Sequence, residues 1–166
     1  MAARMLCAGL LLALLVKPAW AADTASSTVQ PLGVFSAVRA TEDHTYGQRA
    51  RLWHRGTQLL GEILYWDGNI EGQRGRFADG FINRRSGEVR FKIAIVRRDV
   101  QPSTRADATF EGILNKGVLA GKLTWISDAA KFRGKAGVED WTLRFEKDER
   151  LDAYSGVEAW RKSQAE

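Results

Sequence analysis

Aromatic side chains in predicted β-strands are the residues of this chain best suited to hold a ligand. A ring with a polar N–H or O–H edge can line a pocket for a sugar, a lipid or a heterocycle, and it can equally pack inside a core. Core packing is therefore the alternative for every member of this set. The candidate ligand-binding residues are Trp53, Tyr65, Trp125 and Trp141.

Trp66 belongs to a different candidate site. It directly follows Tyr65, and neighbouring residues of a strand point to opposite faces, so one of the two rings is expected near solvent. If the chain turns back at Asp67-Gly68, Arg74 and Arg76 come to lie beside this pair. Aromatic rings mixed with arginines are typical of protein-contact surfaces. Trp66, Arg74 and Arg76 are thus the candidate protein-contact residues.

Few residues could carry out catalysis. Glu62 would be a candidate general acid or base with a raised pKa if its face of the strand turned inward, and an ordinary surface residue if it turned outward. The two histidines, His44 and His54, show no ligand spacing that indicates a metal site. No G-x-S-x-G motif marks a serine nucleophile. We predict no catalytic residue, no metal and no cofactor, and a small barrel isomerase or hydrolase using Glu62 is the least favoured alternative.

The N-terminal segment has the layout of a secretory signal peptide. Arg4 supplies a positive start, residues 5–16 are mainly apolar, and Ala19-Trp20-Ala21 gives a small-x-small cleavage pattern. This apolar run is shorter than the roughly 20 residues that a membrane-spanning helix needs. Cleavage after Ala21 would remove Cys7, the only cysteine, and would leave a chain the size of one domain. We predict an exported protein, in the bacterial periplasm or outside the cell, without disulfides or thiolate chemistry.

The chain is basic, and its positive charge is concentrated in one region. It carries 25 Lys and Arg against 20 Asp and Glu, and residues 44–98 alone hold 11 basic and 5 acidic side chains. Export argues against a nucleic-acid partner, whereas an acidic envelope protein or another acidic ligand fits the charge. The alternative is that these side chains are solvated outward positions that discourage edge-to-edge strand pairing.

The elements that must position these residues are short strands. Clean alternation in residues 89–95 and 141–145 indicates half-buried strands, and Ala78-Asp79-Gly80 is a predicted bulge in the fourth strand. An apolar pattern with a period of three in residues 151–160 predicts a short C-terminal helix. We expect a signal peptide (1–21), a loose lead-in (22–33) and one β-domain with its helix (34–166). The expected strands lie near residues 34–41, 48–55, 58–66, 70–77, 89–97, 108–114, 118–126 and 138–146.

Glycines in the middle of apolar strands indicate the shape of the sheet. The pattern apolar-x-Gly-x-apolar recurs around Gly61, Gly112 and Gly121. A strand coils more sharply at such a glycine, or a large neighbouring side chain lies over it. Eight strongly curved antiparallel strands can close into a small up-and-down barrel. At this size the side chains either fill the interior or leave one small cavity, and the bulk of the expected inward residues favours filling.

The expected all-β barrel resembles the calycins, the lipocalin-like and avidin-like barrels, in architecture. The lipocalin Gly-x-Trp of the first strand has only Gly33-Val34-Phe35 as its counterpart, so the resemblance assigns no residue a role. Two functional hypotheses remain. The first is a non-catalytic exported barrel that binds a small apolar or amphipathic ligand at an open end. The second is a protein-interaction module, such as an inhibitor, an immunity-type protein or an envelope accessory factor, that uses the basic, aromatic surface.

Overall fold

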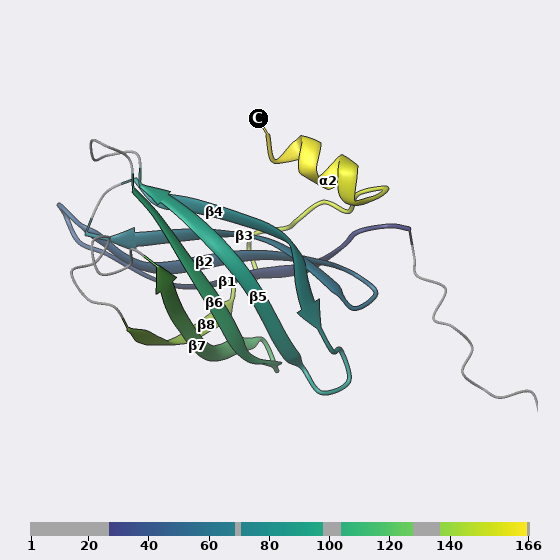
Figure 1. Cartoon of the computed structure of the whole chain (residues 1–166), viewed down its shortest axis with the longest axis horizontal. Helices are drawn as coiled ribbons and strands as arrows, with labels where there is room; N and C mark the ends of the chain where they lie inside the picture. The colour runs from purple at the N-terminus through teal and green to yellow at the C-terminus, as the bar shows by residue number, and fades with distance from the viewer. Residues whose placement is uncertain (1–26, 69–70, 98–103, 128–136, 166) are drawn as a thin grey trace, which may run out of the picture.

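The computed structural model describes residues 27–68, 71–97, 104–127 and 137–165. Within them, eight antiparallel strands close into a barrel in sequence order, and a short helix follows the last strand (Figure 1). The barrel closes where β1 pairs with β8 at Phe35 and Phe145. The elements are β1 (Gln30–Ala40), β2 (Thr45–Arg55), β3 (Gln58–Asp67), β4 (Gln73–Ile82), β5 (Glu88–Arg97), β6 (Thr104–Asn115), β7 (Val118–Ser127), β8 (Val138–Phe145) and α2 (Val157–Ser163).

The predicted fold class is confirmed, although some element boundaries differ from the prediction. β1 begins at Gln30, inside the expected loose lead-in, and the preceding Val29 pairs with Tyr154 through two backbone hydrogen bonds. The C-terminal helix covers only the second half of the apolar pattern, because the chain becomes helical after Gly156. Leu151 and Tyr154, the first half of the pattern, are not helical, but their apolar side chains pack on the outside of the barrel. The predicted signal peptide lies outside the described residues.

The predicted bulge in β4 is confirmed. Pairing between β3 and β4 slips by one residue between the Leu59–Gly80 and Gly61–Phe77 pairs. An extra residue in one strand bends it and changes the side to which the following residues point. Phe77 and Ile82 therefore both belong to the inner core, although strict alternation would place them on opposite faces.

A column of aromatic rings fills the middle of the barrel. Phe77 stacks on Phe91 with ring centroids 4.3 Å apart, and Phe91 stacks on Phe110 at 4.9 Å. Trp141 continues the series, 5.6 Å from Phe110. All four side chains are buried, and we call them the aromatic column.

Three strand glycines make room for this column. Gly112 and Gly121 are opposite each other on β6 and β7, and the Phe110 ring lies over both. A Cβ at Gly121 would be 2.3 Å from the carbonyl oxygen of Glu111 and 2.8 Å from the Phe110 ring. Gly61 lies in the same way beneath Phe77, where a Cβ would be 2.6 Å from the ring. The glycines thus allow large side chains to cross the interior.

A second apolar cluster lies outside the barrel wall. Trp53 of β2 and Leu60 of β3 pack there with Val29 and with Trp160 of α2, and Figure 1 shows α2 outside the strands. The indole Nε1 of Trp53 donates a hydrogen bond to the carbonyl oxygen of Asp152 at 2.9 Å. The segment between β8 and α2, residues 146–156, is thereby attached to the outer surface. We call it the C-terminal strap.

Candidate functional site

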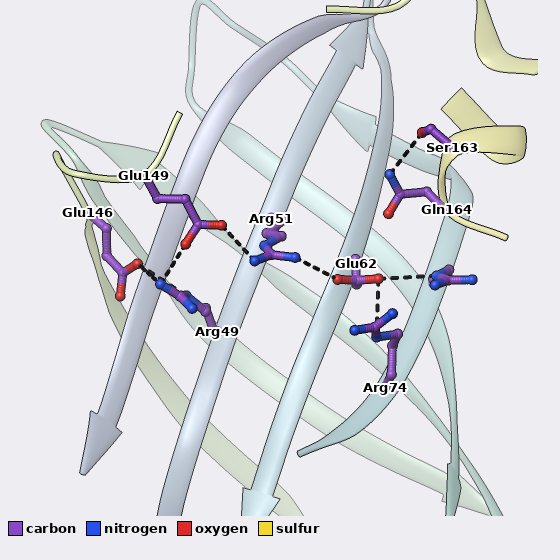
Figure 2. Close-up of polar contacts among 9 residues, drawn as sticks. Arg49, Arg51, Glu62, Arg74, Glu146, Glu149, Ser163 and Gln164 are labelled. Carbon is purple, nitrogen blue, oxygen red and sulfur yellow. Dashed lines mark hydrogen bonds and ion pairs between the residues drawn. The ribbon is translucent and has the colours of Figure 1, made fainter. Parts of the chain in front are cut away.

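Four arginines and Glu62 cluster on the outer surface of β2, β3 and β4. Figure 2 shows Arg49, Arg51 and Arg74 together with Glu62. Arg49 and Arg51 come from β2, and Arg74 and Arg76 come from β4. Strand register places Arg51, Glu62 and Arg76 in one row, with Arg49 and Arg74 in the next row along the strands. We call this surface the arginine face.

Glu62 is the centre of the arginine face, and only 2% of its side chain is exposed. Its Oε1 is 3.3 Å from Nη1 of Arg51, and its Oε2 is 3.2 Å from Nε of Arg76 and 3.4 Å from Nε of Arg74. Three positive groups thus surround one negative group. Both expectations for Glu62 need correction: it faces outward, so it is no interior acid, yet arginine side chains cover it, so it is no ordinary surface residue.

The three arginines around Glu62 remain open to solvent to different degrees. Arg74 is 51% exposed, Arg76 is 36% exposed and Arg51 is 32% exposed. A guanidinium group has five N–H donors, and Glu62 uses only part of this capacity. The Nε of Arg51 is buried and has no hydrogen-bond partner. Arg74 and Arg76, which share Glu62 as their ion-pair partner among the described residues, therefore hold more positive charge and more donors than Glu62 satisfies.

Two glutamates of the C-terminal strap cover the other part of the arginine face. Arg49 forms ion pairs with Glu146 and Glu149, the latter at 2.6 Å. The second carboxylate oxygen of Glu149 is 2.8 Å from Arg51. Glu149 therefore bridges two arginines that are two positions apart on β2 (Figure 2).

Glu146 is held in its ionised form. Partial burial raises the pKa of Glu146, but hydrogen bonds from Ser36 and Arg49, together with the positive charges of Arg49 and Arg51, outweigh this effect. The net result is a pKa below the ordinary value for a glutamate. The strap thus keeps a negative charge against β2 at neutral pH.

The predicted protein-contact residues lie together on the outer surface. Trp66 is half-buried next to the arginine face, and its indole lies against Gly72, where a Cβ would be 2.6 Å from the ring. Leu64, between Trp66 and Glu62 on the same side of β3, is the direct cross-strand neighbour of Arg74. The surface therefore combines arginines with a ring and an aliphatic side chain.

Three of the four predicted ligand-binding aromatics meet at one end of the barrel interior. The rings of Tyr65 and Trp125 are in edge-to-face contact at 5.7 Å. Trp125 Nε1 donates to the carboxylate of Glu139, and the Tyr65 hydroxyl and Trp141 Nε1 each lie 3.5 Å from its Oε2. All three rings are buried. Trp53 lies apart from them, in the outer apolar cluster.

Gln73 is a further polar side chain at this end. It is the cross-strand neighbour of Tyr65 and is only 8% exposed. Neither its amide oxygen nor its amide nitrogen has a hydrogen-bond partner. A buried polar group without a partner costs about 1–3 kcal/mol, and a bound molecule, water included, is the usual way in which such a group is satisfied.

Neither histidine forms an ion pair with the arginine face among the described residues. His44 Nδ1 is 2.9 Å from the carbonyl oxygen of Gly68. Burial and the charge of Arg84 lower the pKa of His54, against the opposite effect of a backbone hydrogen bond at Gly56. Among the described residues, no three His, Cys, Asp or Glu side chains are grouped to hold a metal ion.

Six polar residues of these sites were not among the predicted site residues: Arg49, Arg51, Gln73, Glu139, Glu146 and Glu149. Gln73 and Glu139 could have been found from strand alternation. Gln73 is four residues before the buried Phe77 and Glu139 is two residues before the buried Trp141, so each points to the same face of its strand as that ring. Glu146 and Glu149 follow β8, where no periodic pattern indicates which way a side chain points. Their contacts with β2 depend on the path of the strap across the barrel.

Comparison of the chain with known protein families, with curated proteins and with solved structures found no match. No helix within the described ranges is long and apolar enough to cross a bilayer.

Proposed function

We propose that this protein is an exported, non-catalytic interaction module that binds an acidic segment of a partner protein on its arginine face. The observation that carries the proposal is the burial of Glu62 beneath Arg51, Arg74 and Arg76. Export is supported by the signal-peptide pattern of residues 1–21.

Stability does not account well for this cluster. Packed apolar residues generally stabilise a fold as well as a buried ion pair does, or better, and ion pairs as exposed as that of Arg74 are worth about 0–1 kcal/mol. Glu62 fixes three guanidinium groups in one place and leaves some of their N–H donors unused. Arginine in such an arrangement is well suited to bind carboxylates in a bidentate manner.

The surroundings favour a protein segment over an isolated anion. The positive groups extend along both β2 and β4, and Leu64 and Trp66 supply apolar contact between and beside them. Arginines and aromatic residues together are enriched in protein interfaces. The filled interior supports the same choice, because the aromatic column takes the middle of the barrel.

Fluorescence anisotropy with a defined acidic probe tests the proposal. The probe is a labelled short peptide with two glutamates three residues apart, and the control peptide has glutamines in their place. The test variant is Arg74→Gln with Arg76→Gln. The matched control is Lys92→Gln with Lys122→Gln, which removes the same charge from exposed positions on β5 and β7.

The acidic peptide is expected to bind the wild-type protein, and the arginine variant is expected to bind it about tenfold more weakly, with less than about a twofold loss in the lysine control. Equal losses in the two variants, or equal binding of the glutamine peptide, would contradict the proposal. Anionic lipid vesicles that compete better than the peptide would assign the arginine face to a membrane surface instead.

A second candidate function, small-ligand binding, is supported by Gln73. Its unpartnered amide lies at the interior end together with Tyr65, Trp125, Trp141 and Glu139. A small ligand with both a donor and an acceptor would satisfy it. Native mass spectrometry of protein purified from its source, compared with the denatured mass, is expected to show an added mass that Gln73→Leu loses. A native mass equal to that of the protein alone would mean that only water contacts the Gln73 amide, and it would eliminate small-ligand binding as a function.

A further inference from the structure

The C-terminal strap contacts the arginine face in the way that the proposed partner would. Glu149 gives one carboxylate oxygen to Arg49 and the other to Arg51, at 2.6 and 2.8 Å. Glu146, three residues earlier, pairs with Arg49. The strap thus presents two carboxylates, three residues apart, to two arginines of one strand.

The arginine face is consequently divided into a covered half and an open half. Glu146 and Glu149 neutralise Arg49 and Arg51 on β2, whereas Arg74 and Arg76 on β4 have Glu62 as their ion-pair partner among the described residues. The open half would meet a partner first, and the covered half would become available only if the strap carboxylate moved away.

The strap is attached on both sides of Glu149 by contacts that do not involve this side chain. At one end, the backbone N–H of Glu146 donates to the carbonyl oxygen of Val34 at 2.8 Å. At the other end, Tyr154 pairs with Val29 and the carbonyl oxygen of Asp152 accepts from Trp53. Between these ends, residues 147–151 form no backbone–backbone hydrogen bond within the described part of the chain. Glu149 can therefore leave β2 while the strap stays attached.

We infer that Glu149 is a built-in competitor of the acidic partner. It occupies Arg49 and Arg51 in the free protein and is displaced when a partner segment with two carboxylates at the same spacing extends from the open half to the covered half. This inference rests on the proposed function, since it names the chemistry of the partner and the way in which its access is regulated. The strap therefore sets a minimum affinity for the partner, because a weakly acidic segment gains too little binding free energy to displace Glu149 from Arg49 and Arg51.

The test uses the same labelled peptide with Glu149→Gln and a matched control, Glu158→Gln. Glu158 is also C-terminal, but it is 83% exposed on α2 and pairs with Arg161 away from the arginine face. Both changes remove one negative charge, so the general effect of net charge is equal in the two variants. Unchanged far-UV circular dichroism and thermal midpoints verify that each variant is folded.

We expect Glu149→Gln to bind the peptide about tenfold more tightly than the wild type does, and Glu158→Gln to stay within about twofold. If the two variants bind equally, while Arg74→Gln with Arg76→Gln still weakens binding, the competitor role is wrong and the proposed function stands. If neither the wild type nor Glu149→Gln binds the peptide, both are wrong.

Discussion

The inner and outer sides of β3 and β4 differ in packing and polarity. Inward, Gly61 and Phe77 pack in a close-fitting interior where added atoms meet neighbours below 3 Å. Outward, Glu62 and Arg76 form a polar surface with partly exposed donors. Because alternate residues of the same strands serve the two sides, the inside can determine stability while the outside is free to determine recognition.

The largest expected effect is on the inside. Phe110 contacts two other members of the aromatic column, so Phe110→Ala removes two ring contacts and leaves a cavity. We expect a loss of about 3–5 kcal/mol in the free energy of unfolding, measured by urea denaturation. Ile113→Ala, at a position 45% exposed on the same strand, is the control and is expected to cost much less. Equal costs at the two positions would mean that the column does not stabilise the barrel.

Filling the space beneath the column is expected to cost somewhat less. Gly121→Ala places a Cβ against the carbonyl oxygen of Glu111 and against the Phe110 ring. The backbone cannot move away easily, so we expect a loss of about 1–3 kcal/mol in the same denaturation assay. Gly137→Ala, where a Cβ would meet nothing within 4 Å, is the matched control. A neutral Gly121→Ala would show that the glycine is not needed for ring packing.

On the outer side, the loss in the free energy of unfolding is expected to depend on how deeply the mutated side chain is buried. Glu62→Gln leaves three guanidinium groups without their shared negative charge, and we expect a loss of about 1–3 kcal/mol. Arg74→Gln changes a half-exposed ion pair and is expected to cost less than about 1 kcal/mol. Thermal denaturation of the two variants compares these values directly. If Arg74→Gln were as costly as Glu62→Gln, the arginine face would be a stabilising network rather than a binding surface.

The smallest effects concern the pH dependence of stability, and the two groups begin to act at different pH values. The folded protein lowers the pKa of His54, so the unfolded chain takes up this proton first and stability falls as pH drops below about 6.5. The folded pKa of Glu146 is also lowered, so its contribution is present above about pH 4.5 and is lost as pH falls through the lower folded value. Thermal midpoints measured from pH 8 to pH 3 should decline in two steps. His54→Gln should remove only the upper step, and Ser36→Ala should weaken only the lower one.

The barrel was predictable because its determinants are local. Alternation in β5 and β8 and the bulge at Ala78-Asp79-Gly80 are signals carried by neighbouring residues. Strand alternation likewise placed Tyr65 and Trp66 on opposite faces, as the structure has them.

The candidate site was predictable only in part. Trp66, Arg74 and Arg76 follow from one hairpin, but the two glutamates that pair with Arg49 and Arg51 from the C-terminal strap lie about a hundred residues further along the chain. Trp53 was expected with the interior aromatics and lies outside, because the C-terminal segment forms its own apolar cluster on the wall. The contacts of the C-terminal strap depend on where an irregular segment crosses the barrel, and such a path produces no periodic pattern in the sequence.

The proposed function requires the partner to bind on the outer surface of the barrel and not in its interior. An NMR titration of ¹⁵N-labelled protein with the acidic peptide distinguishes these two regions, because arginine Nε–H signals report the outer surface and the indole Nε1–H signals of the interior tryptophans report the inside. We predict shifts in the Nε–H signals of Arg74 and Arg76 and in the backbone of β2 to β4, with the indole signals of Trp125 and Trp141 unchanged. Shifts confined to these two indoles, or no shifts at all, would contradict the account.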